Sequence, residues 1–142
     1  MALLGGGVGG AGNPVGGSFT GPAEALEIIG DHCYAISGEV QDAASGGANS
    51  TLFKFTSGNF YSVCNIDFAN NVSVNNQTFL ALNFNGVDVM TFDNDLEGSF
   101  QDQPVKLDVI IPPYTEVTFK WGCNTTKEGC AFLTGRIYRT RD

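Results

Sequence analysis

The only histidine in the sequence, His32, follows Asp31 directly. A histidine beside a carboxylate can serve as the base of a catalytic dyad, but that chemistry also requires a nucleophile. No serine stands in the G-x-S-x-G pattern of a nucleophile elbow. We therefore expect His32 to have a structural or surface role, and we predict that the chain is not an enzyme and has no catalytic residues.

A second candidate for chemistry is the acidic run Asp-Asn-Asp-Leu-Glu at positions 93–97. Its oxygen atoms are the ligands that calcium prefers. The run lacks the glycine at position six and the glutamate at position twelve of an EF-hand loop. Acidic loops between strands are common, so we expect a solvated loop, no metal site and no cofactor.

The four cysteines show no Cys-x-x-Cys spacing, which argues against a structural zinc site. Cys123 and Cys130 flank a stretch that we interpret as a hairpin loop. They could form a disulfide across its base in an oxidising environment and would remain thiols in a reducing one. Cys33 and Cys64 lie in strand-like runs and are expected to be small core residues.

Two further surface chemistries remain open. Exposed aromatic side chains could stack on sugar rings, although most aromatic residues in strands belong to a core; the candidates are Trp121, Tyr114, Tyr61 and Tyr138. Four glycosylation sequons begin at Asn49, Asn71, Asn76 and Asn124. Without a signal peptide we interpret them as incidental, and a removed leader would reverse that interpretation.

Charge is scarce in this chain of 142 residues, of which 15% are charged, and the formal net charge is −8. An acidic surface repels phosphate backbones, so we expect no nucleic-acid partner. No apolar run approaches the ~20 residues that span a bilayer, so we expect no membrane partner. The N-terminus lacks the basic region of a secretory signal. A chain beginning at Met1 is therefore expected to be made in the cytosol.

Residues 1–23 form a zone of their own, with nine glycines and no charged residue before Glu24. A glycine-rich segment loses much entropy on ordering and cannot build a core by itself. Spaced apolar residues nevertheless interrupt the glycines: Leu3, Leu4, Val8, Val15 and Phe19. We call this zone the N-terminal arm and predict that these five residues contact a neighbouring subunit, the alternative being a flexible tail without a role.

Residues 24–142 show strand patterns with turn signals between them. Asn85-Gly86 separates two alternating runs, 78–84 and 87–92, and predicts a hairpin with a type I′ turn. The segment 22–29 favours either a turn of helix or the start of a strand. The further strands are expected at 32–40, 51–56, 60–68, 104–111, 114–121 and 130–138, the last two forming a pair. This count predicts an all-β, two-sheet antiparallel sandwich, a jelly roll first and another Greek-key sandwich second.

The runs 109–119 (VIIPPYTEVTF) and 132–138 (FLTGRIY) resemble the closing strands of small virion proteins of tailed phages. A glycine-rich arm ahead of a compact sandwich also resembles capsid decoration (cement) proteins. The resemblance implies a structural protein on the capsid exterior, made in the host cytoplasm, whose partner is the major capsid protein. It further implies a homotrimer that uses the arm for subunit contacts.

Two alternatives stand beside this interpretation. One is a head-fibre, knob or tail component that binds host surface glycans. The other is a binding module or filament subunit whose arm completes the fold of a neighbour, as extended segments do when they add to a sheet edge.

Overall fold

The computed structural model describes residues 21–43, 46–71, 77–93 and 105–139, and within these ranges the regular structure is entirely β. Its first five strands are β1 (Glu27–Ile29), β2 (His32–Ile36), β3 (Val40–Ala43), β4 (Ser50–Thr56) and β5 (Tyr61–Asn70). The remaining five are β6 (Thr78–Phe84), β7 (Val87–Asp93), β8 (Val105–Ile111), β9 (Glu116–Cys123) and β10 (Thr126–Tyr138). The segment 22–29 thus forms a strand at its end and not a helical turn.

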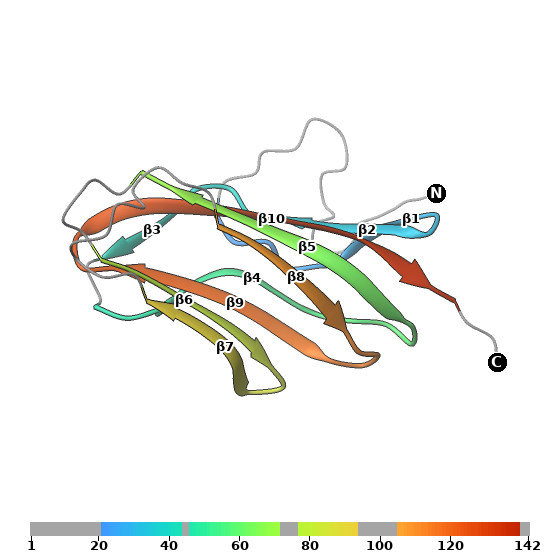
Figure 1. Ribbon diagram of the computed structural model, residues 1–142. Helices are drawn as coiled ribbons and strands as arrows, with labels where there is room; N and C mark the ends of the chain where they lie inside the picture. Colours follow the sequence, from blue (N-terminus) through green and yellow to red (C-terminus); the bar gives the residue numbers. More distant parts are fainter. Residues whose placement is uncertain (1–20, 44–45, 72–76, 94–104, 140–142) are drawn as a thin grey trace.

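The strands form two antiparallel sheets that pack face to face (Figure 1). The six-stranded sheet has the order β1-β2-β10-β5-β8, with β3 also paired to β10, and the four-stranded sheet has the order β4-β9-β6-β7. When β1 and β3 are set aside, the two sheets have the orders β2-β10-β5-β8 and β4-β9-β6-β7, which is the strand order of a jelly roll. The predicted two-sheet sandwich is therefore confirmed, and its strand order is the jelly roll that we expected first.

The Asn85-Gly86 hairpin is also confirmed. Asn85 has a φ of 53° and Gly86 a φ of 88°, as both central residues of a type I′ turn require. The Asn83 side chain accepts a hydrogen bond from the Gly86 amide at 2.8 Å. β6 and β7 therefore follow one another as neighbours at one edge of the four-stranded sheet.

The predicted pairing of the last two strands is wrong. β9 pairs with β4 and β6, whereas β10 pairs with β2, β3 and β5 in the other sheet. The two residues between them, Asn124 and Thr125, carry the chain from one sheet to the other. The segment around Cys123 and Cys130 is consequently a crossing between layers and not a hairpin loop.

The core between the sheets is built from inward-facing residues, as the period-2 alternation of each strand dictates. A row of aromatic contacts runs through it from the four-stranded sheet to the six-stranded one. Phe53 stacks on Phe119 at a centroid distance of 5.3 Å, and Phe68 contacts both Phe119 and Trp121, at 6.3 and 5.6 Å. Trp121 lies over Gly129, where an added Cβ would come within 2.8 Å of the indole ring.

Buried polar groups tie the layers together. Asp42 on β3 is 1% exposed, accepts a hydrogen bond from the Ser50 hydroxyl at 2.8 Å, and accepts another from the Cys123 amide at 3.0 Å. One carboxylate thereby joins three strands, β3, β4 and β9. We expected residues 42–50 to be a loop, and the sequence pattern did not reveal this role of Asp42.

Candidate interaction surface

The outer face of the six-stranded sheet is a candidate interaction surface. Alternation along β5, β8 and β10 turns every second residue away from the core. The strand register then aligns these residues in rows across the sheet. One row reads His32, Arg136, Val63 and Ile110, and another reads Ile36, Phe132, Asp67 and Lys106.

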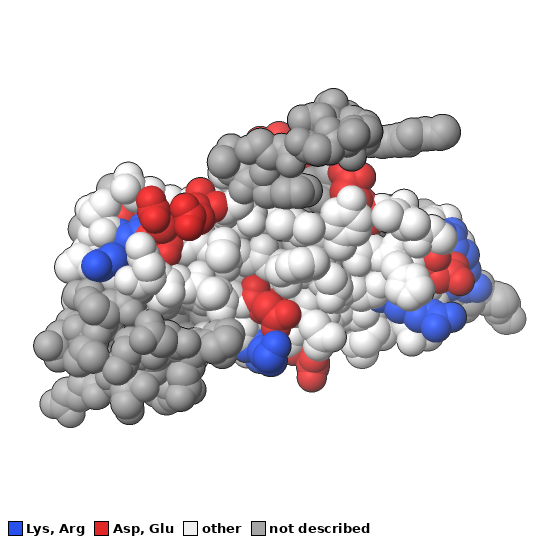
Figure 2. Space-filling view, turned by 90° about the horizontal axis from the view of Figure 1, so that it is seen from above, with Lys and Arg blue, Asp and Glu red and all other residues white. Residues whose placement is uncertain are grey.

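Several large apolar side chains on this face are open to solvent. Ile110 is 61% exposed, Phe132 45% and Val63 40%. Figure 2 looks down on this side of the molecule, and uncharged residues cover most of the surface described there. Contiguous exposed apolar surface rimmed by polar groups is typical of protein interaction sites. We call this face, between the row of His32 and the row of Phe132, the outer surface.

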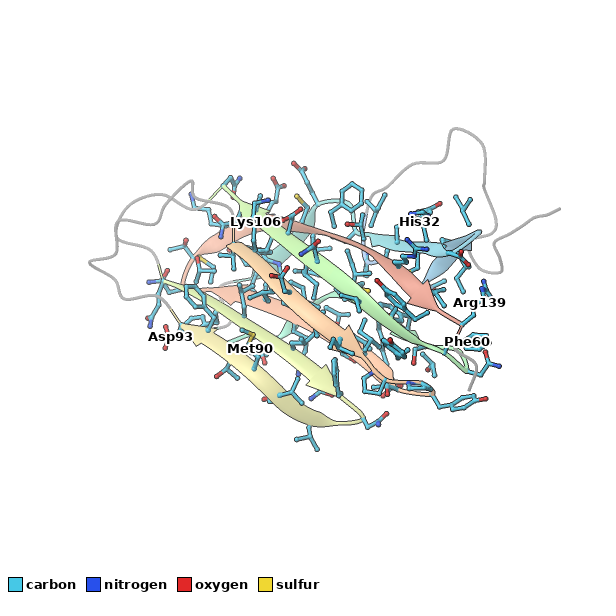
Figure 3. The ribbon with its side chains drawn as sticks, turned by 45° about the vertical axis from the view of Figure 1, so that its right-hand side comes forward. His32, Phe60, Met90, Asp93, Lys106 and Arg139 are labelled. Carbon is cyan, nitrogen blue, oxygen red and sulfur yellow. The ribbon has the colours of Figure 1, made fainter. Side chains whose placement is uncertain are left out.

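Charges on the outer surface are few and partly compensated. The Lys106 ammonium group lies 2.9 Å from the Asp67 carboxylate, and Asn65 donates a hydrogen bond to Asp108. Arg136 and His32 face solvent at the other end of the same sheet, and Figure 3 shows His32 and Lys106 far apart along it. The row between these two ends reads Tyr34, Thr134, Asn65 and Asp108, so the middle of the surface is polar.

An aromatic cluster borders the outer surface at the end of β10. Tyr61 and Tyr138 are register partners whose rings stack at 5.3 Å with an interplanar angle of 8°. The Arg136 guanidinium lies 5.7 Å from the Tyr138 ring centroid. Arg139 lies 5.4 Å from the Phe60 ring centroid, and the two are adjacent in Figure 3. Cation–π contacts of this kind hold the rings in place.

Tyr114 stands on a neighbouring turn and is 72% exposed. Its φ of 54° is unusual for a bulky residue, so the turn must hold it in place. The Tyr114 amide donates to the Gly58 carbonyl at 2.8 Å. The Ser57 hydroxyl donates to the Pro112 carbonyl at 2.7 Å and accepts from the Thr115 amide at 2.9 Å. These bonds present the phenol ring to solvent.

The structure separates the predicted sugar-stacking candidates. Tyr61, Tyr114 and Tyr138 lie at or near one end of the sandwich, but Trp121 is fully buried and its Nε1 donates to the Val40 carbonyl at 3.2 Å. Trp121 therefore cannot form part of a sugar platform. Its burial follows from its inward position on β9, directly over Gly129.

His32 is exposed at the start of β2, opposite Arg136. The carboxylate of its neighbour Asp31 accepts a hydrogen bond from Arg139 Nε at 3.1 Å. Asp31 thus fixes the end of β10 to the β1–β2 turn. The described contacts place His32 in a surface row of the sheet, in keeping with the surface role expected for it.

The cysteines are arranged differently from the disulfide hypothesis. All four are free thiols, with Cys123 buried and Cys130 half-buried in strands of different sheets. The close pair is instead Cys33 and Cys64, whose sulfur atoms are 3.9 Å apart across Gly135 on β10. Two strand spacings put their Cα atoms roughly 9.5 Å apart. That separation exceeds the reach of a disulfide of about 7 Å, so this pair packs as thiols in the core.

The two buried thiols influence each other's ionisation. A hydrogen bond from Cys33 lowers the pKa of Cys64 to about 7. The same contact with Cys64, together with burial, raises the pKa of Cys33 above its ordinary value of 9.0.

Several sequence predictions lie outside the described residues. These are the five arm residues Leu3, Leu4, Val8, Val15 and Phe19, the acidic run after Asp93, and the sequons that begin at Asn71 and Asn76. Within the described ranges, no three His, Cys, Asp or Glu side chains are grouped so that they could hold a metal ion. In those same ranges we find no helix of the length and hydrophobicity needed to cross a bilayer.

No protein-family model matches the sequence, and no curated protein matches it.

Proposed function

We propose that this protein is a structural virion component that decorates the outer surface of a phage capsid and stabilises the shell. The outer surface is the observation that carries the proposal. Its exposed apolar side chains and the polar groups beside them are held on a sheet, so it offers preformed contact area without the entropy cost of ordering a loop.

The two rows combine exposed apolar side chains with charged groups, as interfaces with an apolar centre and a polar rim do. Phe132, Val63 and Ile110 come from three adjacent strands, so they are held in fixed register across the sheet. Arg136 and Tyr138 lie beside them, and arginine and tyrosine are residue types enriched where binding energy is concentrated. The major capsid protein is the proposed partner, and the chain's net charge of −8 would keep decorated particles apart in solution.

A homotrimer that also uses the N-terminal arm fits the same proposal. Several weak contacts made by linked subunits bind together more tightly than any one of them alone. The arm supplies backbone groups and five spaced apolar residues for contacts between subunits.

Co-sedimentation with capsids tests the proposal. Purified protein is mixed with heads of the encoding phage that lack it, and the bound fraction is measured. We expect Phe132→Asp to abolish binding, because it replaces an exposed apolar side chain of the outer surface with a second carboxylate beside Asp67. The matched control is Thr56→Asp, an exposed position on β4 of the other sheet. Equal binding by both variants would contradict the proposal.

A second function is favoured by the aromatic end of the sandwich. The Tyr138 ring lies against Arg136 and stacks on Tyr61, and aromatic rings next to polar groups can hold a sugar. In this proposal the chain is a head-fibre, knob or tail component that binds host surface glycans. A glycan array would support this function if the wild-type protein bound a glycan but not capsids, and if Tyr138→Ala abolished the glycan binding.

A further inference from the structure

The four-stranded sheet has two edges, β4 and β7, and the chain itself partly covers the first. Ala23, the last residue of the N-terminal arm, forms a parallel bridge with Phe53 of β4. Its amide donates to the Leu52 carbonyl at 3.0 Å, and its carbonyl accepts from the Lys54 amide at 2.9 Å. The chain that leaves the arm thus already adds to this sheet as an extended segment.

The opposite edge, β7, pairs with β6 alone in the described part of the chain. Six of its seven residues are exposed, and Phe92 is half-buried. Val87, Val89 and Met90 offer apolar side chains along it, and Figure 3 marks Met90 and Asp93 on this part of the sheet. An edge strand of this kind, without proline or lysine, is a template for another extended segment.

We propose that the free edge of β7 accepts the N-terminal arm of a second copy of this chain as an additional strand. The inference rests on the proposed function in taking the arm as a subunit contact, and it names where the arm binds. The added strand would gain main-chain hydrogen bonds from β7, and its apolar residues would contact Val89 and Met90.

Charge favours the arm over a second β7 strand as the occupant. Two β7 edges side by side would bring Asp88 and Asp93 of both copies together, and like charges across a strand pair are destabilising. Residues 1–23 carry no charged side chain, so they add no repulsion. Their nine glycines also add no side chain that could clash with β7.

The length and exit point of the arm fit an exchange between copies. Twenty extended residues reach about 66 Å, whereas the seven residues of β7 span about 23 Å. The arm joins its own domain at the β4 edge, and the acceptor is the other edge of the same sheet. Donor and acceptor surfaces therefore differ, which makes the contact head-to-tail. Such contacts form a ring, such as a trimer, when the rotation between copies closes, and a filament when it does not.

Cross-linking of the full-length protein tests the inference directly. In a Cys130→Ser background, one chain carries Val8→Cys and the other carries Thr91→Cys, at an exposed position of β7. We expect a disulfide-linked dimer in the mixture. The matched control replaces Thr91→Cys with Ile110→Cys, which lies on the edge strand of the other sheet, and is expected to give none. No dimer, or equal dimer in both mixtures, would overturn the inference.

A backbone variant provides a second test. The β6–β7 register shifts between Leu82 and Asn83, which leaves Val89 without a Cα partner on β6. Proline is tolerated at such bulges but cannot donate a hydrogen bond to an added strand. We expect Val89→Pro to shift the oligomer to monomer in light scattering, whereas Val89→Ala remains assembled. An unchanged oligomer with folded Val89→Pro would overturn the inference.

The two proposals can fail separately. If β7 is the wrong acceptor, the Val89→Pro protein stays assembled and still co-sediments with capsids. If capsid decoration is the wrong function, the wild-type protein assembles and gives the Val8–Thr91 cross-link but does not co-sediment.

Discussion

Gly135 offers the sharpest test of how the six-stranded sheet is assembled. It lies on β10 between Cys33 of β2 and Cys64 of β5, facing the core. A Cβ added there would lie 2.4 Å from Cys64 Sγ, 2.5 Å from the Val63 carbonyl oxygen and 2.8 Å from Cys64 Cα. Two of these three atoms belong to the backbone, so a change of rotamer cannot relieve the contacts.

The expected cost of Gly135→Ala follows from these distances. The backbone of β5 would have to move by roughly 0.9 Å to restore an ordinary contact. Overpacking of a core costs about 1–3 kcal/mol, and we expect the upper end because the strand itself must move. At about 3 kcal/mol, the loss is a large part of the 5–15 kcal/mol that stabilises a typical domain.

Urea unfolding measures this loss, with Gly58→Ala as the matched control. Gly58 has no atom within 4 Å of an added Cβ, so we expect a change below about 0.5 kcal/mol there. In a Cys64→Ala background the Sγ contact disappears but the Val63 contact remains, so the cost of Gly135→Ala should fall only in part. If Gly135→Ala were as stable as Gly58→Ala, the placement of β10 between β2 and β5 would be refuted.

Three further predictions concern buried polar groups and thiols. Asp42→Ala leaves the buried Cys123 amide without its side-chain acceptor, so the free energy of unfolding measured in urea should fall by about 3 kcal/mol. An unchanged unfolding midpoint would contradict the role of this carboxylate. In the native protein a thiol reagent should modify Cys130 first, and the three buried cysteines only when the protein unfolds. Modification of more than one cysteine in the folded protein would contradict the burial described. The free energy of unfolding should decrease as the pH rises above 9.0. Burial and the Glu39 carboxylate raise the pKa of the Cys130 thiol, and the hydrogen bond with Cys64 raises the pKa of the Cys33 thiol. Unfolded thiols then lose their protons before the folded ones do, and a stability that rises in this range would contradict the assignment.

Local sequence patterns were sufficient for most individual strands, although not for β3, which lies where a strand end and a loop were expected. The Asn85-Gly86 turn was predictable because both residues must adopt positive φ and few residue types do so readily. The alternation in 104–111 likewise gave β8 and its buried face. These signals depend on neighbouring residues alone, so one sequence contains them in full.

Pairing between strands was less accessible. Tyr114–Trp121 and Cys130–Tyr138 are close in sequence, which usually indicates a hairpin, yet β9 and β10 belong to different sheets. Contacts between the two sheets, such as Trp121 over Gly129, stabilise this arrangement. The alternation of residues within a single strand does not reveal such contacts. Trp121 was a candidate for sugar stacking for the same reason: an aromatic residue in a strand does not show by itself which face of that strand is buried.

The outer surface also depends on long-range register. Tyr61 and Tyr138 are 77 positions apart, and only the pairing of β5 with β10 stacks their rings. Arg136, Val63 and Ile110 become one row for the same reason. The signal for the outer surface in the sequence was a pair of strands with apolar residues at alternating positions. It identifies a surface only when the pairing of the two strands is known.

Electron cryomicroscopy of heads of the encoding phage tests the central claim most directly. The account predicts density for this jelly roll on the outside of the shell, with the face that carries Val63, Ile110 and Phe132 covered by a neighbouring protein. Density for the chain in the tail or a fibre, or a shell without it and with that face open to solvent, would contradict capsid decoration.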